Sequence, residues 1–334
     1  MPVAGVVLAA VESDARERLV VLRALGLGDL LTALPALRAL REAFPSHRLS
    51  LAAPDTLAPL AQLSEAVDEV VDAAPLAPLP APLHGADVAA NLHGRGPQSH
   101  GVLLAARPRR LLAFEHLDVT QSRGGPTWRA AEHEVARWCR LLEELGIPAD
   151  PSRLALTPPE SSASVRGATV VHPGAASPAR RWPPERFAAV AQAERAAGRE
   201  VVVTGSSDEA ELARAVAGDA GLSSKAVLAG GTDLLELAAV VAGADRVVCG
   251  DTGVAHLATA LATPSVVLFG PTSPREWGPP IERPRHRPLW AGHTGDPHAA
   301  EPDPGLLAIA VGDVLEALQG LPGRGDAERR ARAA

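Results

Sequence analysis

A small polar turn between an apolar run and a helical pattern is the first feature of this sequence that could do chemistry. Asp251, Thr252 and Gly253 follow the run RVVCG (246–250) and precede the pattern VAHLATALA. The first N–H groups of a helix lack partners within it and the helix dipole is positive there, so a phosphate group can bind at this point. His256 lies one helical turn further on. Helix chemistry alone leaves a second interpretation equally open, in which Asp251 or Thr252 only caps the helix.

Two adjacent arginines form a second candidate anion site. The segment HPGAASPARRWPPERF (172–187) places Arg180 and Arg181 before a predicted helix that begins at a proline. Arginine side chains can bind phosphate through two parallel hydrogen bonds. Taken alone, this motif favours a solvated pair of arginines beside a packed Trp182.

A third polar turn, RALGLGD (23–29), follows the first predicted strand. It is not a dinucleotide-binding fingerprint, because Leu31 stands where the third glycine would be, and no nicotinamide cofactor is expected. Asp29 has two compatible interpretations: a general base at the mouth of a cleft, or the N-cap of a helix over 30–43.

A fourth turn, NLHGRG (91–96), ends another predicted strand. Asn91, His93 and Arg95 could contact an acceptor sugar or brace the turn. The residues alone favour bracing.

Histidines gather in the Pro-rich segment RHRPLWAGHTGDPH (285–298). His286, His293, His298 and Asp296 are all candidate metal ligands by type. Their spacing fits no known ligand pattern, so no metal site is expected.

Alternating β-branched runs, glycine turns and helical patterns predict an α/β chain with two doubly wound parallel sheets. We expect two domains, over 1–160 and 161–320, that face a central cleft, and a flexible tail over 321–334. Open α/β sheets bind ligands beyond the carboxyl ends of their strands, so the turns at 26–29 and 250–253 are expected to open into the cleft. Other expected elements are a strand over 18–24, a strand in KAVLAGG (225–231), helices over 131–146 and 304–320, and a linker over 147–167.

Composition excludes several classes of protein. The 334 residues carry a net charge of −7, which argues against a nucleic-acid partner and leaves at most peripheral contact with an anionic membrane. The apolar stretch 3–11 is too short to span a bilayer and lacks a basic leader. Cys139 and Cys249 lie in a helical and a strand pattern, which is typical of buried thiols in a reducing compartment. We expect a soluble cytoplasmic protein.

Three segments together resemble glycosyltransferase family 9, whose best-known members are ADP-heptose:lipopolysaccharide heptosyltransferases. They are VLRALGLGDLLTALPALRALREAFP, HPGAASPARRWPPERF and GDTGVAHLATALATPSVVLFGPTSP, and the resemblance runs over residues 18–280. It implies a GT-B fold of two Rossmann-like domains, in which the C-terminal domain binds a nucleotide-sugar donor and the last helix packs back on the N-terminal domain. It also implies an inverting transfer that needs no metal or other cofactor, with ADP-heptose as the foremost donor.

The motifs and the resemblance together assign candidate roles. Asp29 is the expected general base. The expected donor-binding residues are Arg180, Arg181, Glu236, Asp251, Thr252, Gly253 and His256, with Glu236 near the ribose. The expected acceptor-binding residues are Gly28, Asn91, His93 and Arg95.

Two departures from the family keep other functions open. Ala176 stands where many members have Ser or Thr, and the segment 282–303 replaces one that contains cysteine in some relatives. The alternatives are a transferase that uses a UDP-, GDP- or dTDP-sugar, a nucleotide-sugar epimerase or hydrolase, and a non-catalytic nucleotide-binding protein. The acceptor is a glycan, a glycolipid or a small metabolite, and the negative net charge keeps acceptors other than lipopolysaccharide open. We expect a monomer.

Overall fold

The structure is a computed structural model that describes residues 17–159, 165–280 and 282–322. The apolar stretch 3–11, the domain boundary expected at 160 and the tail from 323 onward lie outside the described residues. Within the described residues, no helix is long and apolar enough to cross a membrane.

The first half of the chain builds a parallel five-stranded sheet in the order β3-β2-β1-β4-β5. Its strands are β1 (Arg18–Leu22), β2 (Arg48–Ala53), β3 (Glu69–Asp72), β4 (Val88–Asn91) and β5 (Arg110–Leu112). Its helices are α1 (Leu27–Ala43), α2 (Ala58–Leu63), α3 (Gln98–Ala105) and α4 (Glu134–Glu144). The expected strand over 18–24 and helix over 131–146 are confirmed with shorter bounds.

The second half builds another parallel five-stranded sheet, in the order β10-β9-β8-β6-β7. Its strands are β6 (Thr169–His172), β7 (Val201–Val203), β8 (Arg246–Gly250), β9 (Ser265–Phe269) and β10 (His286–Trp290). Its helices are α5 (Pro184–Ala196), α6 (Ala210–Asp219), α7 (Leu234–Gly243), α8 (Gly253–Ala260), α9 (Pro274–Trp277), α10 (Pro304–Ala308) and α11 (Val311–Gln319).

Each sheet has one topological switch point, where neighbouring strands send the chain in opposite directions. It lies between β1 and β4 in the first sheet and between β6 and β8 in the second. The four polar turns of the sequence follow these four strands. The fold therefore gathers all four turns at the two places where open sheets bind ligands.

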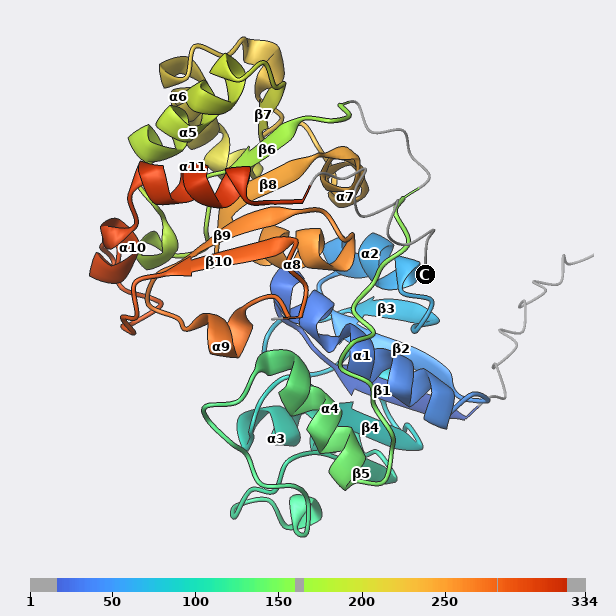
Figure 1. Cartoon of the computed structure of the whole chain (residues 1–334). Coiled ribbons are helices and arrows are strands. Elements are labelled where there is room, and N and C mark those ends of the chain that lie inside the picture. The colour runs from blue at the N-terminus through green and yellow to red at the C-terminus, as the bar shows by residue number, and fades with distance from the viewer. Residues whose placement is uncertain (1–16, 160–164, 281, 323–334) are drawn as a thin grey trace, which may run out of the picture.

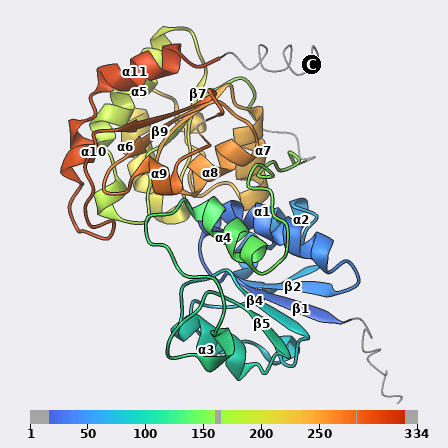
Figure 2. The same cartoon turned by 60° about the horizontal axis from the view of Figure 1, so that its bottom comes forward.

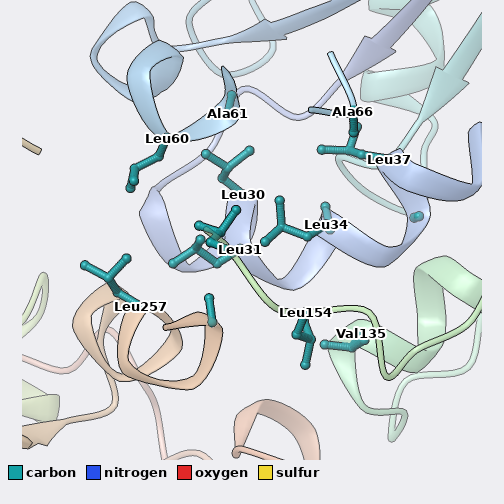
Figure 3. Packing of buried hydrophobic residues seen from close by; sticks show 14 of the residues in the cluster. Leu30, Leu31, Leu34, Leu37, Leu60, Ala61, Ala66, Val135, Leu154 and Leu257 are labelled. Atoms are coloured by element: carbon teal, nitrogen blue, oxygen red, sulfur yellow. The ribbon is translucent and has the colours of Figure 1, made fainter. Parts of the chain in front are cut away.

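One hydrophobic core joins the two halves. Strand side chains alternate between faces, so Leu19 of β1 and Val170 of β6 both lie in the cluster between the sheets. Figures 1 and 2 show α1 and α8 side by side at the centre of this layer, where they pack against each other. Leu31 of α1 and Leu257 of α8 are buried in the same cluster (Figure 3). The cleft is thus closed at its base by α1 and α8.

The fifth strand of the second sheet is not the expected one. KAVLAGG (225–231) forms only an isolated bridge between Val227 and Val203, and β10 takes the edge of the sheet. Its Pro288 pairs in register with Val267 of β9. An edge strand tolerates proline because one side of it needs no hydrogen bonds.

The expected helix over 304–320 is broken into α10 and α11. The carbonyl of Ile309 accepts hydrogen bonds from Trp182 Nε1 at 3.1 Å and from Arg186 Nη1 at 2.9 Å, which ties the chain down at the break. The expectation that the last helix returns to the first half is wrong for α11. This helix packs on α5, β9 and β10, because Val314 and Leu318 complete the core on that face of the second sheet.

Candidate active site

A cavity of about 380 Å³ lies where the two switch points face each other. The first half lines it with the start of α1, and the second half with the start of α8, the 3₁₀ turn Pro178–Arg180 and part of α9. Of the predicted site residues, the cavity brings together Gly28, Asp29, Arg180, Asp251, Thr252, Gly253 and His256.

Asp29 faces this cavity from the first turn of α1. The helix begins at Leu27, three residues earlier than expected, so Asp29 is not its N-cap. Its Oδ2 accepts a hydrogen bond from the Gly26 N–H at 3.2 Å, and its side chain remains 27% exposed. Burial raises the pKa of Asp29 above its ordinary value; the positive charge of Arg23 opposes this rise and the charge of Glu134 adds to it.

Arg23 holds Asp29 in place and was not singled out from the sequence. It is 1% exposed. Its Nε donates to the Asp29 carbonyl at 3.0 Å, and its Nη2 lies 3.3 Å from Asp29 Oδ1 and 2.9 Å from Glu134 Oε1. The guanidinium also lies over the Trp138 ring, 4.9 Å from its centroid. An arginine inside the apolar run RLVVLRA was the available signal, because a buried arginine needs a partner.

The N-terminus of α8 forms the opposite wall. Thr252 is the N-cap, and its Oγ1 accepts a hydrogen bond from Val254 N–H at 3.3 Å. The capping interpretation is therefore confirmed for Thr252 and wrong for Asp251. The remaining N–H groups at this helix end are donors that can face an anion.

Two glycines let the halves approach closely beside the cavity. A Cβ at Gly253 would lie 2.8 Å from the Cβ of Leu27, and a Cβ at Gly28 would lie 2.9 Å from the His256 ring. Both glycines thus serve the contact between α1 and α8.

Asp251 and Arg180 lie together behind the helix end. The Asp251 side chain is buried, and this burial raises its pKa to about 6 although the positive charge of Arg180 lowers it. Arg180 Nη1 donates to the Asp251 carbonyl at 3.4 Å. Its Nε is buried and has no hydrogen-bond partner among the described residues.

His256 is a neutral side chain in this site. Burial and the nearby His133 lower its pKa to about 4. Its ring lies edge-on to Trp277 of α9, with 6.0 Å between the ring centroids. His256 can therefore exchange hydrogen bonds near neutral pH without carrying a charge.

Three predicted acceptor residues do not line the cavity. Asn91 is fully buried, and its amide nitrogen donates to the Gly94 carbonyl and to Ser99 Oγ, so it braces the turn. His93 is half-buried and Arg95 is exposed. Asn91 therefore braces the turn, which is the interpretation that the residues alone favoured.

Two predicted donor residues also lie outside the lining. Arg181 points away, and its Nε donates to the Ala175 carbonyl at 2.9 Å. Glu236 closes a capping box at the start of α7, where its Oε2 accepts from the Asp233 N–H at 2.8 Å.

The histidine-rich segment is divided among different structures. His286 is buried in β10 and bonds Ser265 Oγ at 2.9 Å, while His293 pairs with Asp303. Across the described parts of the chain, no group of three or more His, Cys, Asp or Glu side chains could hold a metal ion. Cys139 and Cys249 are both buried, as expected.

Comparison with solved structures shows the fold. An Escherichia coli ADP-heptose lipopolysaccharide heptosyltransferase II has a TM-score of 0.70 at 22% identity, over 90% of this chain and 97% of that one. An Escherichia coli heptosyltransferase solved with ADP-2-deoxy-2-fluoro heptose has a TM-score of 0.68 at 20% identity, over 90% of this chain and 99% of that one. The two parallel sheets are therefore those of a GT-B fold.

Sequence comparison reaches part of the chain. Lipopolysaccharide heptosyltransferase 2 of Salmonella typhimurium is 34% identical over 113 residues, which are 33% of this chain and 32% of that protein. The chain thus matches about a third of the length of this curated relative. The model of glycosyltransferase family 9 (heptosyltransferase) matches residues 125–295, about half of the chain, and includes the α8 wall but not Asp29. On this match, the chain belongs to glycosyltransferase family 9, the heptosyltransferase family.

Proposed function

We propose that the protein is an inverting glycosyltransferase that moves a sugar from a nucleoside diphosphate to an acceptor hydroxyl without a metal ion. The observation that carries the proposal is one cavity with a carboxylate, Asp29, on one wall and an anion-binding helix end on the other. ADP-heptose is the first donor to test, because the solved relatives are described with ADP-heptose or its fluoro analogue. The acceptor class is a glycan, a glycolipid or a small metabolite.

Asp29 acts as the general base in this proposal. Its carboxylate takes the proton of the acceptor hydroxyl while the hydroxyl oxygen attacks the anomeric carbon. The bond from that carbon to the diphosphate oxygen breaks in the same step. Since the base and the leaving group occupy opposite walls, the acceptor enters opposite the departing diphosphate and the anomeric configuration inverts.

The leaving diphosphate takes the electron pair of the broken bond, and the negative charge that it gains must be stabilised. Stabilisation comes from the free N–H groups of α8, the Thr252 hydroxyl and the positive charge of Arg180, whose positions are set before the substrate binds. Arg180 Nη1 donates to the Asp251 carbonyl, and the nearby Asp251 carboxylate attracts the guanidinium. We therefore propose that Asp251 supports the diphosphate site through Arg180, because a carboxylate itself repels phosphate.

The raised pKa of Asp29 suits a base. A carboxylate whose pKa is raised by burial holds a proton more strongly than one in water, and the rise improves proton transfer near neutral pH. Arg23 keeps the ionised form accessible by opposing that rise.

We further propose that Glu236 accepts a hydrogen bond from a ribose hydroxyl through its second carboxylate oxygen, the one that does not cap α7.

A matched pair of arginine variants tests the donor site. Titration calorimetry with ADP would be done on the wild type, Arg180→Gln and Arg181→Gln. Loss of a hydrogen bond to a charged group is expected to weaken ADP binding about tenfold or more in Arg180→Gln. Arg181→Gln is expected to bind like the wild type, because Arg181 points to the Ala175 carbonyl.

Two other results have distinct meanings. Equal affinities in all three proteins would contradict the placement of the diphosphate. A preference for UDP, GDP or dTDP over ADP would keep the site and change the donor.

A further inference from the structure

The segment 291–303, to which the sequence assigned no role, contributes Pro297 and His298 to the lining of the cavity. It follows β10 and returns across the carboxyl end of β9. The Gly295 N–H donates to the Pro271 carbonyl at 3.0 Å, just beyond β9. The Ala179 N–H donates to the Ala299 carbonyl at 3.2 Å. The segment is thus fastened to the end of one strand and to the turn that carries Arg180.

A brace closes the segment at both ends. His293 Nδ1 lies 3.2 Å from the carboxylate of Asp303, which is buried and caps α10 by accepting from the Gly305 N–H at 2.8 Å. The Asp303 N–H in turn donates to the Ala179 carbonyl at 3.1 Å. Trp290 Nε1 donates to the His293 carbonyl at 2.8 Å. These bonds attach the segment to its surroundings at His293 and at Asp303.

The segment brings Pro297 and His298 to the cavity, and His298, which is exposed, is the one with a polar side chain. The backbone N–H of His298 donates to Asp296 Oδ1 at 2.9 Å, and this bond closes a tight turn. Ala299, the next residue, makes the hydrogen bond to Ala179, and Arg180 follows Ala179. His298 and Arg180 therefore flank a single backbone hydrogen bond, and both line the cavity.

The neighbours of His298 define what it can recognise. Arg180 is a cation and the α8 end is a row of N–H donors, so this side of the cavity attracts anions. Ala176, which also lines it, has no polar side-chain atom. A histidine ring carries an N–H donor in either tautomer.

We propose that His298 donates a hydrogen bond to the diphosphate of the donor and so favours nucleoside diphosphates over nucleosides. This inference rests on the proposed function and adds a third anion-binding element to α8 and Arg180.

The test compares two ligands that differ only in the diphosphate. ADP affinity would be measured by titration calorimetry, and adenosine affinity by saturation-transfer NMR at millimolar concentration. The proteins are the wild type, His298→Ala, His298→Asn and Thr294→Ala. Thr294 is an exposed residue of the same segment outside the cavity lining, so its variant is the matched control.

His298→Ala is expected to weaken ADP binding about tenfold and to leave adenosine binding unchanged. His298→Asn, whose amide can donate, is expected to recover part of the loss. Unchanged ADP affinity in His298→Ala, or an equal loss for adenosine, would overturn the inference and leave the proposed function intact. Absence of binding of ADP, UDP, GDP and dTDP to the wild type would overturn both.

Discussion

At the residue scale, the site contains an aspartate, Asp251, whose ionised form is disfavoured by burial. Asp251 is buried behind the α8 end, and its pKa is raised to about 6. In the unfolded chain the pKa of an aspartate is about 3.9. Between the two pKa values, Asp251 is therefore protonated in the native state and ionised in the unfolded state. The contribution of Asp251 to stability is fully present below about pH 4 and is lost as the pH rises through 6.

Asp251→Asn is expected to raise the melting temperature at pH 7.5 by a few degrees and to change it little at pH 4. Asparagine is neutral at both pH values, so it avoids the burial of a charge. Thermal unfolding at the two pH values checks this, with the exposed Asp208→Asn as control. A lower melting temperature for Asp251→Asn at pH 7.5 would mean that the attraction to Arg180 outweighs the burial.

Residue types alone predicted the parts of the site that have local causes. A cap at Thr252 and donors at the α8 end follow from neighbouring residues. Arg23 could not be linked to Glu134 in this way, because 111 residues separate them and only the packing of α4 beside α1 brings them together. The sequence indicated His298 only as a candidate metal ligand, since its place beside the cavity depends on the hydrogen bond between Ala179 and Ala299.

At the element scale, the contact between α1 and α8 sets the geometry of the cavity. These helices bring Asp29 and the N-terminal end of α8 to opposite sides of one cavity. Their approach depends on Gly28 and Gly253, which the sequence indicated as acceptor-binding and donor-binding residues and not as contacts between the two helices. The early start of α1 at Leu27 was missed because glycines at 26 and 28 are typical of a turn.

Gly253→Ala is expected to lower the free energy of unfolding by about 1–3 kcal/mol, because the new Cβ would lie 2.8 Å from the Leu27 side chain. Gly101→Ala is the matched control. Gly101 lies inside α3 with nothing within 4 Å of an added Cβ, and the variant should gain about 0.5–1 kcal/mol. Urea denaturation measures both. An unchanged Gly253→Ala would contradict the close packing of the two helices.

At the scale of the whole molecule, the arrangement of the sheets was the most predictable property. Alternation of strands, turns and helices indicated two parallel sheets, and both are present. The edges were harder, because β10 contains a proline and two charged or polar residues, His286 and Arg287, and its strand conformation depends on pairing with β9. The path of α11 was implied only by resemblance, and the core around Trp182 keeps that helix on the second sheet.

The whole molecule is needed for the proposed reaction, because the base comes from the first half and the donor site from the second. The most direct test is to measure, for Asp29→Asn, both the rate of ADP release from ADP-heptose with a saccharide acceptor identified on the wild type and the dissociation constant of ADP. We expect the rate to fall at least about 100-fold while ADP affinity stays within about twofold. Transfer at the wild-type rate in Asp29→Asn would contradict the role of Asp29 as the general base.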